Sequence, residues 1–308
     1  MTQTELVIIG AGPAGCSAAI YAVRAGIQTV VLGGAMPGGQ LLQTTEIENY
    51  AGFVNPVGGF EIMDAMHKQC KRLGVQIVTE EAVSIEGEKA PFIVRCNGDK
   101  AYEAKSVIIA TGAQARWLGL PEEEKLRGHG VSACATCDGF FMRGKTVCVI
   151  GGGNTAFEDA LFLAQFCPKV YLVHRREGFR ADQVTVEQAR KNEHIEFVLN
   201  AVPAKILGDE AVTGLRVKNV QTGAETDLTC SGVFVAIGAV PQTAFLKKSP
   251  VGLAENGLVL ADERAHTNVE GIFAAGDCAD PYFRQAIIAA GSGAKAGIEA
   301  AAFINKTR

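Results

Sequence analysis

Two cysteines separated by two residues offer redox chemistry in this chain. Cys134 and Cys137 stand in the segment Cys-Ala-Thr-Cys-Asp. Such a pair can close a disulfide through a tight turn, and one thiol stabilises the thiolate of the other, so the pair can cycle between dithiol and disulfide. The alternative is half of a zinc site, which needs a second close pair of cysteine or histidine ligands. The other seven cysteines are scattered along the chain, so the spacing favours redox chemistry.

A glycine-rich turn near the N-terminus has the spacing of a dinucleotide-binding fingerprint. The apolar segment 6–9 runs into Gly10-Ala11-Gly12-Pro13-Ala14-Gly15, and small apolar residues follow over 16–25. Strand, turn and helix stand in the required order, with Gly10 allowing the sharp turn and Gly12 letting the backbone approach a pyrophosphate. The helix N-terminus attracts the phosphate charge. For one such run taken alone, a plain turn is the alternative.

The same pattern returns in the middle of the chain. Residues 146–150 lead into Gly151-Gly152-Gly153-Asn154-Thr155-Ala156, and 157–166 read as a helix. Each copy also ends in a matching strand and turn, at 107–112 and at 233–238. Two copies in register predict an α/β protein with two Rossmann-like domains, each a doubly wound, three-layer structure that binds a dinucleotide.

The two modules differ at the position that selects the nucleotide. About 20 residues beyond Gly151, where an acid would bind a free ribose hydroxyl, the second module presents His174-Arg175-Arg176 and then Arg180. Guanidinium groups can grip the additional ribose phosphate of NADP with paired hydrogen bonds, and a solvated basic face is the alternative. At the same offset the first module has neither an acid nor an arginine, only Val31-Leu32-Gly33-Gly34.

A downstream segment offers recognition that the first module lacks. Residues 271–277 form an apolar strand that ends in Gly276-Asp277, and a small-residue helix over 284–302 follows. Asp277 could accept hydrogen bonds from ribityl hydroxyls. A flavin that is bound by the first module and covered by this segment would explain both the missing acid or arginine of the first module and the Gly-Asp end of the downstream strand. We therefore expect residues 1–112 and 242–308 to form one discontinuous flavin domain, with the nicotinamide-nucleotide domain 116–239 inserted.

Composition predicts an ordinary globular protein. The 308 residues suffice for about two domains, and 48% of them are hydrophobic and 20% charged. Net charge is -4 without a long basic run, so nucleic acid is not an expected partner. Nine cysteines, an odd number without the dense spacing of a secreted disulfide scaffold, favour a reducing compartment. The first strand begins too early for a signal peptide and no apolar run approaches the ~18 residues of a membrane span, so a cytoplasmic location without membrane association is expected.

Taken together, these residues resemble the low-molecular-weight thioredoxin reductases of bacteria, plants and fungi over essentially the whole chain. The position of the Cys pair is the most specific element, because in the glutathione-reductase-like branch the redox cysteines lie early, inside the flavin domain. Gln242 departs from the usual Asn of the family, and Ala239 from the His of some members. The matching segments are Gly10 to Gly15, Gly38 to Leu41, Glu48-Asn49-Tyr50, Ala133 to Gly139, Gly151 to Ala156, His174-Arg175-Arg176 with Arg180, and Gly276-Asp277 with Arg284-Gln285-Ala286.

The resemblance implies a homodimeric, NADPH-dependent flavoprotein that reduces thioredoxin. Electrons would pass from NADPH to FAD, then to the Cys134–Cys137 disulfide, and then to thioredoxin. The family assigns to Cys137 the place facing the flavin, to Cys134 the attack on thioredoxin, and to Asp138 proton transfer. For Asp138 a turn-capping role before Gly139 is the alternative.

Motifs and resemblance together name the cofactor contacts, and no metal is expected. Residues 36–40 are expected to form a loop over the flavin, and residues 44–46 with Asn49 to line the pocket of its ring. For both segments the alternative is ordinary loop packing. The expected FAD contacts are Gly10, Gly12, Pro13, Ala14, Gly15, Gly39, Gln40, Leu41, Thr44, Asn49, Thr111, Gly112, Gly276, Asp277, Arg284, Gln285 and Ala286. The expected NADPH contacts are Gly151, Gly153, Asn154, Thr155, Ala156, His174, Arg175, Arg176, Arg180, Ile237 and Gly238.

A disulfide and a nicotinamide site on one domain must both meet a single flavin ring on the other. This predicts a domain rotation about linkers near 114–116 and 240–242. Rival interpretations are a peroxide-reductase flavoprotein, a dithiol oxidase, a ferredoxin-driven relative and a noncatalytic redox sensor. The first carries additional N-terminal domains, and the arginine cluster argues against the next two. His67 reads as helix surface without a catalytic role.

Overall fold

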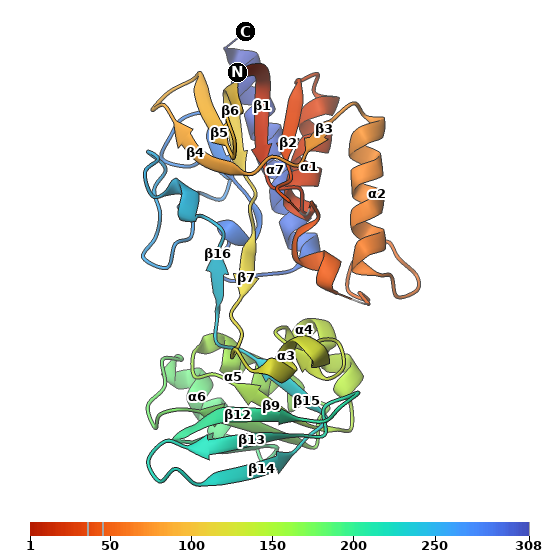
Figure 1. Ribbon diagram of the computed structural model, residues 1–308, viewed down its shortest axis with the longest axis vertical. Coiled ribbons are helices and arrows are strands. Elements are labelled where there is room, and N and C mark those ends of the chain that lie inside the picture. The colour runs from red at the N-terminus through yellow and green to blue at the C-terminus, as the bar shows by residue number, and fades with distance from the viewer. Residues whose placement is uncertain (36, 45, 308) are drawn as a thin grey trace. The chain divides into compact units, whose positions relative to one another are not determined.

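The chain divides into two units, shown in Figure 1, that are joined by two crossings of the backbone. The computed structural model describes residues 1–35, 37–44 and 46–307. Unit 1 comprises Met1–Gln114 and Val240–Arg308, and unit 2 comprises Ala115–Ala239. Short strands at the two crossings, β7 (Ala113–Ala115) and β16 (Ala239–Pro241), pair with each other.

Unit 1 is built on a seven-stranded sheet whose order is β3-β2-β1-β6-β5-β4, with β17 also paired to β6. β6 changes its partner midway, because its first residues pair antiparallel with β5 and its last three pair parallel with β17. The elements of unit 1 are β1 (Thr2–Ile9), α1 (Pro13–Arg24), β2 (Thr29–Leu32), η1 (Gly39–Gln43), α2 (Gly59–Arg72), β3 (Gln76–Val78), β4 (Ala82–Glu86), β5 (Phe92–Cys96), β6 (Ala101–Ile109), η3 (Ala244–Leu246), β17 (Ile272–Ala274), η4 (Gly276–Cys278) and α7 (Ala286–Lys306).

Continuous burial explains the apolar runs of the central strands. Leu6, Val7, Ile8 and Ile9 of β1 are all buried, alternating between two hydrophobic clusters on opposite faces of the sheet. A parallel strand covered on both faces needs apolar residues at successive positions rather than at alternate ones. Sequence and structure therefore agree on an α/β fold with parallel sheets, and the predicted fold class is confirmed.

Helix α7 is long and apolar enough to cross a membrane by length and composition alone, and the described residues contain no other such helix. The small-residue helix predicted over 284–302 corresponds to α7 and is confirmed. Its suitability by length and composition was not predicted, because small and charged residues interrupt its apolar run. In unit 1 it packs on α1 at very short range: a Cβ added at Gly293 would lie 2.0 Å from the carbonyl oxygen of Ala14, and one at Gly297 would lie 2.4 Å from that of Ala18. This packing is that of a core helix.

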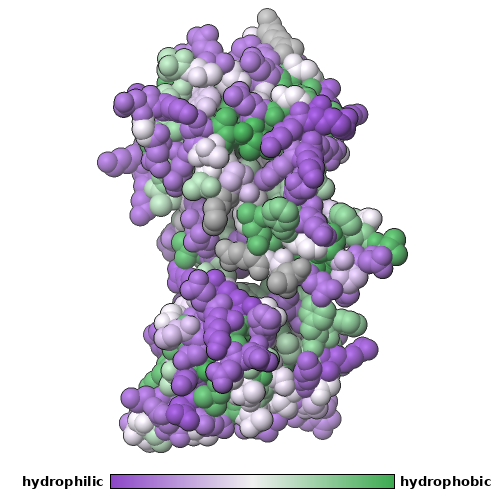
Figure 2. All heavy atoms as spheres, turned by 45° about the vertical axis from the view of Figure 1, so that its right-hand side comes forward, coloured by the Kyte–Doolittle hydropathy of each residue, from purple (hydrophilic) through white to green (hydrophobic). Residues whose placement is uncertain are grey.

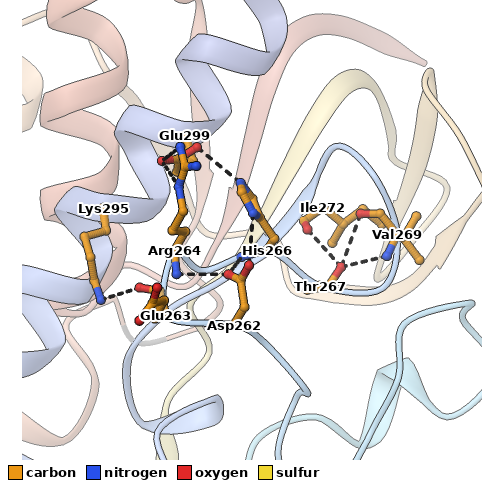
Figure 3. A network of polar contacts seen from close by, with 9 residues as sticks. All are labelled: Asp262, Glu263, Arg264, His266, Thr267, Val269, Ile272, Lys295 and Glu299. Atoms are coloured by element: carbon orange, nitrogen blue, oxygen red, sulfur yellow. Dashed lines mark hydrogen bonds and ion pairs between the residues drawn. The ribbon is translucent and has the colours of Figure 1, made fainter.

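A polar network, drawn in Figure 3, fastens α7 to the segment that precedes β17. One oxygen of Glu299 accepts hydrogen bonds from Nε and Nη2 of Arg264 at 3.0 and 2.7 Å. The other lies 3.2 Å from Nε2 of His266, and Oδ2 of Asp262 lies 3.2 Å from Nδ1 of the same ring. Since β17 leads directly to Gly276 and Asp277, the network steadies the segment expected to close over the flavin.

Unit 2 contains a parallel five-stranded sheet of order β11-β10-β9-β15-β8 and an antiparallel sheet of order β12-β13-β14. Figure 1 shows the three antiparallel strands side by side at one end of unit 2. The elements are α3 (Pro121–Leu126), β8 (Val131–Ser132), α4 (Ala135–Asp138), η2 (Gly139–Met142), β9 (Thr146–Ile150), α5 (Asn154–Leu163), β10 (Lys169–His174), α6 (Gln183–Lys191), β11 (Ile195–Leu199), β12 (Ala201–Leu207), β13 (Gly214–Asn219), β14 (Glu225–Thr229) and β15 (Gly232–Val235).

Candidate active site

The two predicted redox cysteines form a disulfide at the start of the single helical turn α4. Their Sγ atoms are 2.08 Å apart and their Cα atoms 5.3 Å apart. The backbone N–H groups of Cys137 and Asp138 close the turn by donating to the carbonyl oxygen of Cys134 at 3.3 and 3.1 Å. The hydroxyl of Ser132 accepts the N–H of Cys134 at 3.0 Å and so holds the entry to the turn. The seven other cysteines are free and buried.

Asp138 follows Cys137 directly in the chain and adds a carboxyl group next to the redox pair in sequence. Burial raises the pKa of this carboxyl, and a hydrogen bond with Ser132 opposes the shift in part. Asp138 stands at the N-terminal end of η2, yet its side chain makes no capping hydrogen bond there. The geometry therefore argues against the turn-capping alternative. A carboxyl group with a raised pKa is suited to hold a proton and to exchange it with a thiolate.

The redox turn rests on helix α5, which begins at the second glycine turn. A Cβ added at Gly139 would lie 2.9 Å from Cδ2 of Leu163 and 3.2 Å from Cε1 of Phe162. Phe140 and Phe141 follow and are exposed. Unit 2 therefore joins the disulfide, through one helix, to the turn that is expected to hold the nucleotide.

Hydrophilic side chains cover most of the face drawn in Figure 2, with small hydrophobic patches between them.

The second glycine turn is tight on one side and open on the other. A Cβ at Gly151 would lie 2.3 Å from the carbonyl oxygen of Ala236, whereas one at Gly153 would meet no atom within 4 Å. Gly151 is thus required by packing, and Gly153 leaves space next to the start of α5. The N-cap of α5 has no side-chain hydrogen bond, so its first N–H groups are available to a phosphate.

The arginine cluster lies next to this turn. The His174 ring stands over Gly152, and the backbone N–H of Arg180 donates to the Gly152 carbonyl at 2.8 Å. Arg175, Arg176 and Arg180 are exposed, and none of them forms an ion pair within the described part of the chain. Burial lowers the pKa of His174, and the three guanidinium groups lower it further. Unpaired guanidinium groups beside a phosphate-binding turn fit a second phosphate.

The remaining nucleotide candidates lie around the same turn. Asn154 is tied to Asp182, because its Nδ2 donates to Oδ2 at 2.9 Å and its Oδ1 accepts the Asp182 N–H at 2.8 Å. This pair fixes the loop after the arginines rather than leaving Asn154 free for a ligand. Thr155 is exposed, Ala156 packs beneath Gly151, and Ile237 and Gly238 follow β15 at the edge of unit 2.

The first glycine turn lies between β1 and α1 in unit 1. Gly10 has φ +114°, and a Cβ there would lie 2.2 Å from the carbonyl oxygen of Ala110. A Cβ at Gly15 would lie 1.8 Å from the Gly10 carbonyl oxygen, so both positions need glycine. At Gly12 a Cβ would meet a single backbone oxygen at 3.9 Å. Helix α1 begins with Pro13, and the Gly12 N-cap leaves its first N–H groups uncapped.

The loop at 37–44 lies against this turn. The Cβ position of Gly39 is 3.9 Å from the Cα of Gly12, and Nε2 of Gln40 donates to the carbonyl oxygen of Ala113. Leu41 packs against the hydrophobic cluster that contains α1, and the Thr44 carbonyl accepts a backbone hydrogen bond. Met36 and Thr45, expected in the same loop, lie outside the described residues.

The C-terminal segment completes the set in unit 1. Nδ2 of Asn49 donates to Oε1 of Gln285 at 3.1 Å, which joins positions 236 residues apart just before α7 starts at Ala286. A Cβ at Gly276 would lie 2.9 Å from the Cβ of Ala14. The structure therefore brings the C-terminal segment of unit 1 next to Ala14, in the first glycine turn, and next to Asn49.

Two polar groups of unit 1 suit a ligand. Burial raises the pKa of Asp277 to about 6, although the positive charge of Arg284 opposes the shift. Oγ1 of Thr111 is buried near the thiol of Cys278 and makes no hydrogen bond of ordinary geometry among the described residues. Next to it a Cβ at Gly112 would meet no atom within 4 Å. An acceptor, an unsatisfied hydroxyl and open backbone fit a flavin dinucleotide carrying hydroxyl groups.

Sequence reasoning missed two residues of these units. Burial raises the pKa of Asp159 on α5 to about 7, and the negative charge of Glu158 adds to the shift. His67 on α2 was expected at the helix surface but is half-buried, with Nε2 2.9 Å from the carbonyl oxygen of Ala11. For Asp159, helical spacing could have indicated its burial, because it stands three residues before Phe162 and so on the same face of α5. Phe162 packs near Gly139.

Comparisons with known proteins agree on one family. Residues 4–293 match the model described as "Pyridine nucleotide-disulphide oxidoreductase". The chain is 44% identical over 306 residues to "Thioredoxin reductase" of Rickettsia conorii, covering 98% of this chain and 99% of the relative. It is 47% identical to "Thioredoxin reductase" of Mycolicibacterium smegmatis, covering 97% and 96%. The solved structure "Thioredoxin reductase from Giardia duodenalis" superposes with TM-score 0.95 at 37% identity, covering 99% and 100%.

Proposed function

The chain belongs to the pyridine nucleotide-disulphide oxidoreductase family and, within it, to the thioredoxin reductases, and we propose that it takes electrons from NADPH through FAD. Family membership makes it an oxidoreductase with a flavin and a pyridine nucleotide as cofactors and thioredoxin as its disulfide substrate. The observation that most directly supports this electron path is the Cys134–Cys137 disulfide. It lies in the same unit as the second glycine turn and packs on the helix that starts there.

The choice of FAD over FMN rests on the first glycine turn. Its open backbone at Gly12 and the uncapped start of α1 suit a pyrophosphate, which FAD has and FMN lacks. The choice of NADPH over NADH rests on the unpaired arginines after β10. Chromatography of the flavin released by denaturing the purified protein tests the first choice. FAD is the expected product, and FMN as the only flavin would overturn the proposal.

The Cys pair performs the disulfide exchange. A bound flavin would accept a hydride from the nicotinamide and supply two electrons. With these electrons and two protons the Cys134–Cys137 disulfide becomes a dithiol, and Asp138 is placed to exchange one of the protons. The Cys134 thiolate attacks one sulfur of the thioredoxin disulfide, and the sulfur that leaves becomes a thiol. Cys137 then attacks Cys134 in the mixed disulfide, which restores the Cys134–Cys137 bond and releases reduced thioredoxin.

Rotation of unit 2 relative to unit 1 is part of the proposal. The disulfide and the nucleotide turn both belong to unit 2, and the segments expected to hold the flavin belong to unit 1. One flavin ring must exchange electrons with both, so they have to meet it in turn. The chain between the units consists of two crossings, at β7 and β16, where a few backbone dihedral angles can absorb such a rotation.

The family resemblance also leads us to propose a homodimer. Sedimentation equilibrium tests this directly, with a mass of twice 32.4 kDa expected and a monomer at micromolar concentration as the contrary result. We propose a cytoplasmic location as well, supported by the seven free, buried cysteines, which suit a reducing compartment.

A further inference from the structure

Helix α2 contacts the first glycine turn through a histidine. Nε2 of His67 lies 2.9 Å from the carbonyl oxygen of Ala11, the residue between the first two glycines of the turn. A carbonyl oxygen only accepts hydrogen bonds, so the imidazole must carry its hydrogen on Nε2 and donate it. The positions one helical turn away on either side, Met63 and Cys70, are fully buried. His67 therefore lies on the inner face of α2.

Two cysteines reinforce the same junction. The thiol of Cys16, on the first helical turn of α1, donates to the Ala11 carbonyl oxygen at 3.4 Å. The thiol of Cys70 donates to the Cys16 carbonyl oxygen at 3.6 Å. Thiols are weak donors. Of the two donors to the Ala11 carbonyl oxygen, the His67 imidazole is therefore the stronger one.

The direction of the Ala11 carbonyl decides where the next N–H points. In a trans peptide the C=O and the following N–H point in opposite directions. A carbonyl held towards α2 therefore turns the N–H of Gly12 away from α2. Within the described residues no backbone acceptor pairs with that N–H, while the Gly12 carbonyl accepts the Cys16 N–H at 2.9 Å. The donor is left available on the open side of Gly12.

The same helix also supports the second loop of the site. The N–H of Gly59, at the first residue of α2, donates to the Thr44 carbonyl oxygen at 3.2 Å. A Cβ at Gly59 would lie 2.0 Å from the Leu41 carbonyl oxygen, so the loop is packed directly on the helix. Helix α2 thus sets the spacing between the glycine turn and the 37–44 loop, which approach each other at Gly12 and Gly39.

We propose that His67 is a positioning residue of the flavin site, which orients the Ala11–Gly12 peptide so that its N–H faces the pyrophosphate of FAD. This inference rests on FAD being the cofactor, as proposed above. His67 touches neither the flavin nor the substrate in this account and acts only through the Ala11 carbonyl.

The test is the affinity of the flavin-depleted full-length protein for FAD, measured by quenching of flavin fluorescence. His67→Leu keeps side-chain bulk and removes the donor, and His67→Gln keeps an N–H donor of similar reach. One lost hydrogen bond predicts an affinity for FAD about threefold to tenfold weaker for His67→Leu. His67→Gln and the control Gln69→Ala, an exposed position on the same helix, should stay within about twofold of the parent on the same scale.

Should His67→Leu fail to fold, His67→Asn replaces it, because its amide is too short to reach Ala11. The proposal is overturned if the donor-free or short variant binds FAD as tightly as the parent, or if His67→Gln loses as much as that variant. A parent protein that does not bind FAD would instead contradict the proposed function, so the two failures are distinguishable.

Discussion

The backbone N–H of Asp138 donates a 3.1 Å hydrogen bond to the carbonyl oxygen of Cys134, across the single turn that carries the disulfide. This bond does not involve either sulfur atom, so it does not depend on the redox state of the pair. The backbone from which the Asp138 side chain projects is therefore held by a bond that opening the disulfide does not break. Repeated cycling between disulfide and dithiol needs a turn whose backbone persists in both states, and this hydrogen bond supports such a turn.

Asp138→Asn should slow reduction of the disulfide by about a hundredfold, since that is the usual contribution of a positioned proton donor. Because burial raises the pKa of Asp138, its acid form persists to higher pH than that of an ordinary aspartate. In the parent the rate of the flavin-to-disulfide half-reaction should fall as pH rises through this pKa, and in Asp138→Asn that dependence should disappear. Stopped-flow absorbance measures the half-reaction.

The control for this substitution is Glu124→Gln, an exposed carboxylate on α3. It should preserve both the rate and the pH profile of the parent. An Asp138→Asn protein with the parent's profile would mean that the proton comes from elsewhere.

Asp159 should make unit 2 less stable at neutral pH and above than at pH 4. Its pKa rises from 3.8 to about 7 on folding, so the folded state binds a proton that the unfolded state has released between these values. Stability is then lost as pH rises from about 4 to about 7, by up to about 1.4 kcal/mol per pH unit. Asp159→Asn should equal the parent in melting temperature near pH 4 and exceed it by several degrees at pH 8.

Calorimetry across this pH range measures the difference, with Glu193→Gln, an exposed carboxylate after α6, as the control. A difference in melting temperature between Asp159→Asn and the parent that stays constant with pH would show that the Asp159 carboxyl group titrates normally.

Arg175→Ala and Arg176→Ala should raise the KM for NADPH by about tenfold to a hundredfold and leave the KM for NADH nearly unchanged. The reason is that a charge-assisted hydrogen bond to the ribose phosphate is worth about 1.5–3 kcal/mol and NADH lacks that phosphate. Lys191→Ala removes the same charge from an exposed site on α6 and should affect neither substrate. An equal increase in KM for both nucleotides would show that the arginines do not bind the ribose phosphate.

A rigid covalent crosslink between unit 1 and unit 2 should stop turnover and spare at least one half-reaction, because a fixed domain can present only one of its two redox partners to the flavin. Mass spectrometry of crosslinked peptides identifies the joined units, and steady-state turnover is then compared with single-turnover reduction. Crosslinks confined to unit 1 serve as the control and should leave turnover intact. Full turnover of a verified inter-unit crosslink would rule out the rotation.

The sequence predicted those parts of the fold that depend on local backbone requirements. Gly10 and Gly151 occupy positions where a Cβ would strike a carbonyl oxygen, so their glycines mark strand–turn–helix junctions. The apolar run of β1 reflects burial on both faces of a parallel sheet. Such constraints act on each position separately, and a single sequence displays them.

The remaining features depend on contacts between distant segments. The partner change of β6 joins it to β17, more than a hundred residues later, and no local pattern announces that pairing. The hydrogen bond of His67 to Ala11 and the packing of Gly139 on Phe162 likewise arise from tertiary packing. Helix α7 was predicted as a small-residue helix, but its close approach to α1 through Gly293 and Gly297 was not, because that contact joins segments far apart in the chain.

The central claim is that the Cys134–Cys137 pair passes electrons from NADPH to thioredoxin. Its most direct test is steady-state NADPH oxidation in the presence of thioredoxin, measured for the parent, Cys134→Ser, Cys137→Ser and the control Cys96→Ala, which replaces a buried free cysteine. The account predicts sustained turnover for the parent and the control, and turnover at background for both serine variants with flavin still bound. Turnover that persists in either serine variant, or a parent that binds both cofactors without reducing thioredoxin, would contradict it.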